Sequence, residues 1–122
     1  MELIPTEYQE QKSLLEWCSY HPHIYPYLVH ITNEVKCNPL TGKRLNDIGR
    51  KKGVSDLFLA IPTKQYHGLW IEMKRRVKAK VTVEQHEWLD RMNSIGYQAI
   101  VAYGWEEAKE AIESYLQSAS LN

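Results

Sequence analysis

The sequence contains little cysteine and no long apolar run. Its two cysteines among 122 residues, Cys18 and Cys37, form no C-x-x-C pair and no repeated spacing, which is typical of free thiols in a reducing compartment rather than of a disulfide framework. No apolar stretch approaches the roughly 18 residues that a membrane-spanning helix needs. The opening segment, MELIPTEYQEQK, lacks the basic and apolar regions of an export signal. The sequence therefore predicts a cytoplasmic protein with no membrane partner.

The chain also lacks a net charge, since 15 Lys and Arg residues balance 15 Asp and Glu residues. The balance is uneven along the sequence. Residues 36–80 hold twelve basic residues and three acidic ones, a net charge of +9, and the remainder carries the opposite charge. Clustered Lys and Arg can bind the phosphate backbone of nucleic acid without reading its sequence. A solvated charged loop is the alternative interpretation, and charge alone does not separate the two.

Apolar periodicity and turn residues predict the order of helices and strands. Helices are predicted over residues 7–20, 82–96 and 105–116, and strands over residues 27–32, 56–61, 68–74 and 98–103. The two middle strands flank a turn-like segment and should form an antiparallel hairpin, whereas the following strand–helix–strand order favours a right-handed parallel crossover. The sequence therefore predicts one domain over residues 1–122, of the α/β class, with αβββαβα order and a mixed central sheet flanked by helices.

Local patterns support the helix starts and indicate a core. Thr6 and Gln9 have the spacing of a capping box at the first helix. Thr82 and Gln85 repeat this spacing at the second helix. The residues predicted to line the apolar face of the first helix are Tyr8, Leu14, Leu15, Trp17 and Cys18, and those predicted to join the core from later helices are Trp88 and Trp105.

Two carboxylates and a lysine lie on the predicted hairpin. Side chains alternate across a strand, so Glu72 and Lys74 point to the same face. If the start of the first strand pairs with the end of the second, Asp56 lies across from them. Converging carboxylates repel each other, and Mg²⁺, a divalent cation that prefers oxygen ligands, relieves this repulsion. A surface ion pair beside a strand cap is the plain alternative, but the three residues together favour a metal site that hydrolyses phosphodiesters.

Motifs along nearly the whole chain resemble those of the VRR-NUC domain, which belongs to the PD-(D/E)XK nuclease superfamily with its restriction-endonuclease-like fold. The matching segments are TEYQEQ, HITNE, KKGVSD, WIEMK, VTVEQHEWL and GYQAIVAYG. In this comparison KKGVSD resembles the lead into the family's G-x-P-D motif, and WIEMK resembles its I-E-x-K strand. Ser55 stands where the family usually has proline, a residue that shapes the turn and binds no metal.

The resemblance implies a catalytic centre on the hairpin. Asp56 and Glu72 would bind the metal, and the Met73 backbone carbonyl would be a further ligand. Lys74 would orient the attacking water. The implied cofactor is Mg²⁺, with Mn²⁺ as a substitute.

Two helical residues are implied as members of the same site. Glu7 would add a carboxylate or hold a metal-bound water, and Gln85 would support the site by a hydrogen bond near Lys74 or to DNA. Each has a structural alternative, because Glu7 can interact with the helix dipole and Gln85 can serve the capping box. Glu34, in the HITNE segment, would approach the site or the DNA backbone, with a solvated loop position as its alternative.

The implied activity is that of a metal-dependent, structure-specific DNA endonuclease. Small standalone members, often carried by phages, resemble Holliday-junction resolvases and act as dimers, so we expect a homodimer on branched DNA in a bacterial cytoplasm. A monomeric flap or nicking endonuclease and a catalytically silent DNA-binding module are the alternatives. No helix-turn-helix or zinc-finger pattern is present, so DNA shape should guide recognition. The residues expected to contact DNA are Arg50, Lys51, Lys52, Ser55, Arg75, Lys78 and Lys80.

Overall fold

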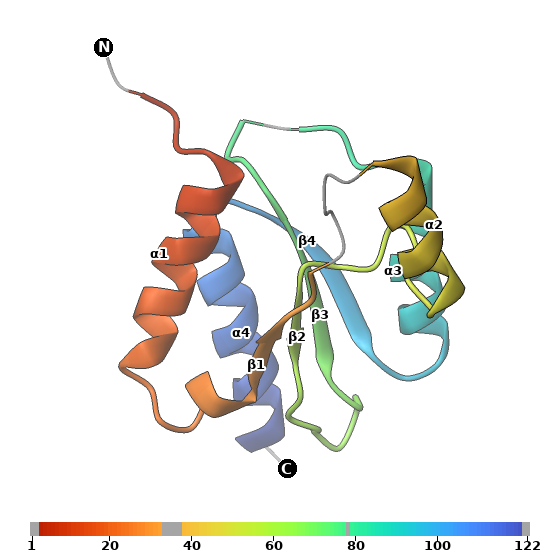
Figure 1. Cartoon of the computed structure of the whole chain (residues 1–122). Helices are drawn as coiled ribbons and strands as arrows, with labels where there is room; N and C mark the ends of the chain where they lie inside the picture. The colour runs from red at the N-terminus through yellow and green to blue at the C-terminus, as the bar shows by residue number, and fades with distance from the viewer. Residues whose placement is uncertain (1–2, 33–37, 78, 121–122) are drawn as a thin grey trace.

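The computed structural model describes residues 3–32, 38–77 and 79–120. Its elements in chain order are α1 (Glu7–Ser19), the 3-10 helix η1 (Tyr25–Tyr27), β1 (Leu28–His30), α2 (Pro39–Asp47), β2 (Leu57–Leu59), β3 (Leu69–Lys74), α3 (Val83–Ser94), β4 (Gln98–Tyr103) and α4 (Trp105–Ser120) (Figure 1). The arrangement is a mixed α/β fold, as predicted. Within the described residues, no helix is both long enough and apolar enough to cross a bilayer.

The strands form one sheet in the order β1-β2-β3-β4. β2 pairs with β1 and with β3 in antiparallel fashion, and β3 pairs with β4 in parallel. The predicted hairpin and the predicted parallel crossover are therefore both confirmed. In the β2–β3 register Leu57 is opposite Ile71, so the residue before β2 lies level with Glu72 at one edge of the sheet.

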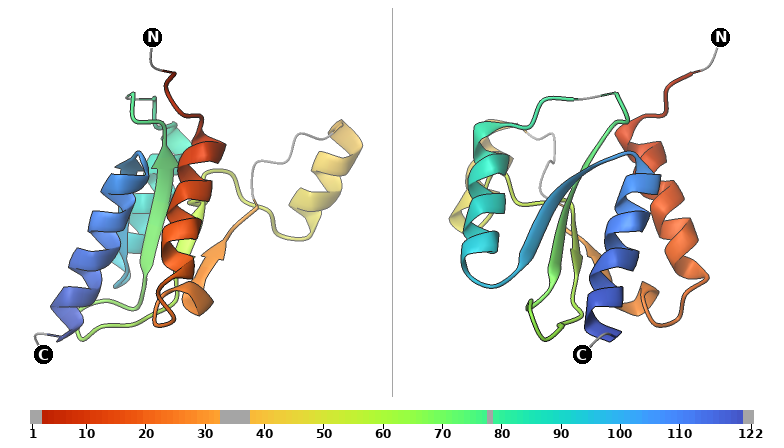
Figure 2. Two further views of the ribbon diagram at one scale, coloured as in Figure 1. Left: turned by 90° about the vertical axis from the view of Figure 1, so that its left-hand side faces the viewer. Right: turned by 180° about the vertical axis from the view of Figure 1, so that it is seen from behind.

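Helices cover both faces of the sheet, with α1 and α4 on one face and α3 on the other (Figures 1 and 2). Leu69, Ile71 and Met73 point into the first layer, where they pack with Leu14 of α1 and Ile112 of α4. Each such buried side chain contributes about 1.5–3 kcal/mol to the free energy of folding. The alternating residues of β3 face α3. Glu72 and Lys74 consequently lie on the α3 side, where β3 ends.

The capping boxes are present at both predicted positions. The Thr6 hydroxyl accepts a hydrogen bond from the Gln9 N–H at 3.1 Å, and the Gln9 side chain accepts one from the Thr6 N–H at 2.9 Å. The same reciprocal pair joins Thr82 and Gln85 at the start of α3. These bonds satisfy backbone donors that the first helical turn leaves without partners.

Helix α2 was not among the predicted elements. Asn38 caps it, with its side chain accepting from the Thr41 N–H at 2.8 Å, and Pro39 occupies the first turn. The helix buries none of its residues, and it projects away from the sheet in the left view of Figure 2. Besides Pro39, its only apolar side chains are Leu40 and Leu45, too few to establish a helical period. The Asn-Pro pair was the available signal.

The predicted core is confirmed with one exception. Leu14 and Cys18 are fully buried, and burial raises the pKa of the Cys18 thiol to about 11. The three predicted core tryptophans are partly buried. Trp17 and Trp105 pack against the main core, which contains Leu14, and Trp88 packs against a smaller apolar cluster on the α3 side of the sheet. Tyr8, by contrast, is 74% exposed. It lies at the border of the apolar face of α1.

Candidate metal-binding active site

Hydrogen bonds from β3 and from the residue after β1 fix Asp56 at the open end of the hairpin. Its Oδ2 accepts from the Met73 N–H at 2.8 Å, which ties the carboxylate to β3. Its backbone carbonyl accepts from the Ile31 N–H at 2.7 Å, just beyond β1. Asp56 therefore lies beside Glu72, as the hairpin geometry predicts. The Met73 carbonyl stays a predicted ligand, while the Met73 side chain is buried in the core.

Glu7, from the first turn of α1, joins these acids in a cluster of three that we call the carboxylate cluster. One oxygen from each of Glu7, Asp56 and Glu72 lies within 4.8 Å of the others. Glu7 is exposed, Asp56 is half-buried and Glu72 is 1% exposed, so the cluster extends from solvent into the sheet. Three carboxylates supply the oxygen donors that Mg²⁺ and Mn²⁺ prefer. The residues present thus fit such an ion.

Gln85 makes two hydrogen bonds, one in the predicted capping box and one to Glu72. Its Oε1 accepts from the Thr82 N–H at 2.9 Å in the capping box, and its Nε2 donates to Glu72 Oε2 at 3.2 Å. Both Gln85 and Glu72 are buried. The cap therefore fixes the Gln85 amide, and the amide in turn orients the Glu72 carboxylate. Lys74, 6% exposed at the end of β3, lies on the same strand face as Glu72.

Residues 50–53, which we call the basic loop, precede β2 and pack against the first turn of α3. Gly53 has a φ of +87°, and a Cβ there would lie 2.3 Å from the Glu84 carbonyl, so only glycine fits this contact. Lys51 and Lys52 on the loop are exposed. Arg50 is half-buried, and its Nε donates to the Asn46 side chain at 3.1 Å. The loop is thus held on the α3 side of the carboxylate cluster.

The prediction that Ser55 contacts DNA is wrong for its side chain, which is fully buried. Its hydroxyl has no hydrogen-bond partner among the described residues. The chain alternates as it enters β2, so Ser55 points inward while Asp56 points to the cluster.

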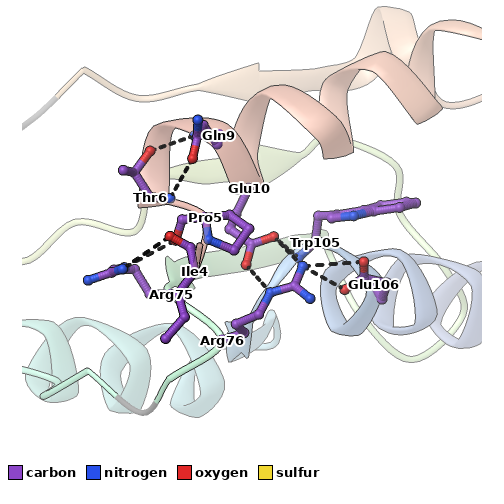
Figure 3. A network of polar contacts seen from close by, with 9 residues as sticks. All are labelled: Ile4, Pro5, Thr6, Gln9, Glu10, Arg75, Arg76, Trp105 and Glu106. Carbon is purple, nitrogen blue, oxygen red and sulfur yellow. Dashed lines mark hydrogen bonds and ion pairs between the residues drawn. The ribbon is translucent and has the colours of Figure 1, made fainter. Parts of the chain in front are cut away.

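The remaining predicted DNA contacts have different surroundings. The Arg75 guanidinium donates to the backbone carbonyls of Pro5 at 3.1 Å and Ile4 at 3.3 Å, so it holds the segment that precedes α1 (Figure 3). Lys80 is exposed. Lys78 and Glu34 lie outside the described residues.

A second acidic site, the Glu10 network, was not predicted and comprises Glu10, Arg76, Trp105 and Glu106 (Figure 3). Glu10 is 1% exposed. Its carboxylate accepts from Arg76 Nε at 2.8 Å and Nη2 at 3.0 Å, and from the Trp105 N–H at 3.3 Å. The hydrogen-bonded Arg76 guanidinium lowers the pKa of Glu10, with a smaller contribution from the Trp105 N–H, although burial opposes this shift. Glu10 and Arg76 are 66 positions apart, so no local pattern could have indicated the pair.

A mixed sheet with two acids and a lysine where its hairpin ends is the arrangement expected of a PD-(D/E)XK nuclease domain. The sequence matches the VRR-NUC domain family over residues 5–106, and the chain belongs to this family of nuclease domains. A solved structure described as a VRR_NUC domain protein superposes with a TM-score of 0.86 at 24% sequence identity. The match covers 97% of this chain and 93% of that one, which shows a shared fold. No curated protein is significantly similar to the sequence.

Proposed function

We propose that the protein is a metal-dependent, structure-specific DNA endonuclease that hydrolyses phosphodiester bonds. The observation that carries this proposal is the approach of Glu7, Asp56 and Glu72 to within 4.8 Å of one another, on the sheet edge where β3 also presents Lys74. Membership of the VRR-NUC family supports the same chemistry. Among the cations that carboxylate oxygens bind, Mg²⁺ is the proposed cofactor and Mn²⁺ its substitute.

The residues of the site have distinct proposed roles. Glu7, Asp56 and Glu72 would hold the ion, with the Met73 carbonyl as a further ligand, and the bound ion would polarise the phosphodiester and acidify a water. Lys74 would orient that water or accept the proton of the water. The positive charge of Lys74 would offset the negative charge of the phosphate. Gln85 would keep Glu72 in place through the bond that it already donates.

DNA is the proposed partner because the basic residues lie beside the cluster. The loop that carries Lys51 and Lys52 packs on α3 through Gly53, next to the turn of α3 that holds Gln85. Exposed lysines there can contact the phosphate backbone without reading bases. We therefore propose branched DNA, recognised by its shape, as the substrate, and a Holliday junction as the preferred form.

The proposal is tested by digesting four labelled substrates in parallel: a four-way junction, a 5′ flap, a splayed arm and a plain duplex. Cleavage should occur with Mg²⁺ or Mn²⁺ and should favour the junction. Ca²⁺ should permit binding with little cutting, since its longer and looser coordination positions the water poorly. Undiminished cutting in EDTA would overturn the metal mechanism. DNA binding without cutting under every metal condition would instead indicate a catalytically silent binding module.

We further propose that the active form is a symmetric homodimer. The described residues of the chain contain one carboxylate cluster, so paired cuts in opposing strands of a junction require two copies, and two-fold dimers are the commonest assembly. Light scattering should give the mass of two chains at micromolar concentration. The mass of one chain, together with cleavage confined to flaps, would overturn the dimer in favour of a monomeric flap or nicking endonuclease.

A further inference from the structure

A groove lies between α1 and β1, directly beside the carboxylate cluster. Its volume is about 390 Å³, and it is lined by Glu7, Tyr8, Gln11, Lys12, Leu15 and His30. Helix α1 and strand β1 lie next to each other in the left view of Figure 2. The volume is within the range of about 300–1,000 Å³ that is usual for sites that bind small molecules.

Both walls of the groove lead into the cluster. On the helical wall, Glu7 is shared, since it lines the groove and is also one of the three clustered carboxylates. On the strand wall, His30 is followed by Ile31, whose N–H donates to the Asp56 carbonyl at 2.7 Å. A DNA strand that crosses the carboxylate cluster would therefore lead into this groove.

The groove presents an aromatic ring and basic side chains to an incoming DNA strand. Tyr8 is 74% exposed, and Lys12 follows one turn later on the same helix face. His30 extends from the opposite wall. Among the described residues that line the groove, Glu7 is the only acid, and it stands at the end that meets the cluster. An exposed aromatic beside basic side chains is the combination with which proteins bind unpaired nucleotides.

We infer that this groove binds an unpaired nucleotide of the DNA strand, next to the scissile phosphate. The base stacks on Tyr8, and Lys12 and His30 contact the phosphates that follow. This inference rests on the proposed nuclease function and adds to it a requirement for DNA that is unpaired or frayed beside the cut.

The groove and the basic loop lie on opposite sides of the cluster. The groove belongs to α1, which packs with α4 on one face of the sheet. The basic loop belongs to the other face, because Gly53 is in contact with the first turn of α3. DNA held by both would cross the carboxylate cluster between them. A continuous duplex buries its bases within the stack, so a branch point satisfies this path better than a plain duplex does.

The test measures binding of a 5′ flap and of a four-way junction, each carrying 2-aminopurine beside the cut, in Ca²⁺ buffer. The fluorescence of 2-aminopurine falls when the base stacks. Wild-type protein should quench it, and Tyr8→Ala should abolish the quenching and weaken binding about tenfold or more. Tyr8→Phe should retain both properties. Tyr20→Ala is the matched control, since Tyr20 is 76% exposed at the other end of α1, and it should behave like the wild type.

Two results would overturn the inference, and both are separable from failure of the proposed function. If wild-type protein cuts branched DNA while Tyr8→Ala is indistinguishable from Tyr20→Ala, the groove is not a nucleotide site. If Lys12→Ala leaves the slope of log K against log salt unchanged, instead of flattening it by roughly one, the phosphate contact is absent. Wild-type protein that neither binds nor cuts DNA would contradict the proposed function and the groove together. Thermal unfolding of each variant checks that the fold is retained.

Discussion

Glu7 and Glu10 lie one helical turn apart on α1, yet they enter two different environments. Glu7 meets two further carboxylates, those of Asp56 and Glu72, within 4.8 Å. Glu10 is buried, and its carboxylate accepts two hydrogen bonds from the Arg76 guanidinium, which also forms an ion pair with Glu106 at 3.3 Å. In the carboxylate cluster like charges approach each other, and in the Glu10 network a guanidinium separates them.

The difference indicates what each group of acids does. A buried carboxylate is stable only when a positive partner and hydrogen bonds replace its lost hydration. Arg76 supplies that partner from within the fold, so the Glu10 network joins α1, the end of β3 and the start of α4 with no external component. In the carboxylate cluster a bound divalent ion would serve the same purpose. The Glu10 network is therefore structural, and the carboxylate cluster is available for chemistry.

The largest expected effect belongs to the cluster. Glu72→Gln and Lys74→Ala should each lower the rate of DNA cleavage by about 100-fold or more, because electrostatic stabilisation and proton transfer each contribute on that scale. Glu10→Gln is the matched control, since it also removes a buried carboxylate charge. Single-turnover cleavage of a labelled junction measures all three rates. Wild-type rates in Glu72→Gln or Lys74→Ala would remove that residue from the proposed site.

The next effect is on stability and belongs to the network. Glu10→Gln should lower the free energy of unfolding by about 2 kcal/mol, because it weakens charge-assisted hydrogen bonds to Arg76 and Trp105. Urea unfolding followed by circular dichroism measures this change. Glu16→Gln, an exposed position on the same helix, should stay within about 0.5 kcal/mol of the wild type. Equal stabilities for the two variants would mean that the network contributes nothing measurable.

A smaller effect should follow from Glu7→Gln. The loss of one carboxylate should raise the Mg²⁺ concentration needed for half-maximal cleavage by about tenfold, since ligand charge sets the affinity of such sites. Glu107→Gln is the control for a helix-dipole effect, because Glu107 is an exposed acid in the first turn of α4. A shared small change in stability with no change in metal requirement would return Glu7 to its alternative role at the helix start.

Sequence reasoning succeeded where a contact follows from alternation and short connections. Asp56 and Glu72 meet because a hairpin fixes which residues are opposite each other, and the capping spacing located Gln85 at the start of its helix. It could not show that Gln85 bonds Glu72 as well, since that contact depends on how α3 packs on the sheet. The approach of Glu7 to the strands was available only through family resemblance.

Other features depended on packing that no local pattern records. Arg76 reaches Glu10 only because the turn after β3 returns to α1. Helix α2 has too few apolar side chains to establish a helical period. Tyr8 shared the spacing of the apolar residues on α1, yet it is 74% exposed. Periodicity identifies a face, and only the packed neighbours determine how far along the helix that face is covered.

The smallest predicted effect concerns pH and tests the network against the cluster. The pKa of Glu10 in the folded protein is lowered from 4.5, chiefly by its hydrogen bonds to Arg76. A lowered pKa means that the carboxylate contributes its full stability above about pH 4.5 and loses it as the pH falls through the folded value. The stability difference between wild type and Glu10→Gln should therefore be constant from about pH 7 to pH 5 and should shrink in more acidic buffer. Urea midpoints across this range measure it, and a difference that persists unchanged to about pH 3 would show that the Glu10 charge does not produce the effect.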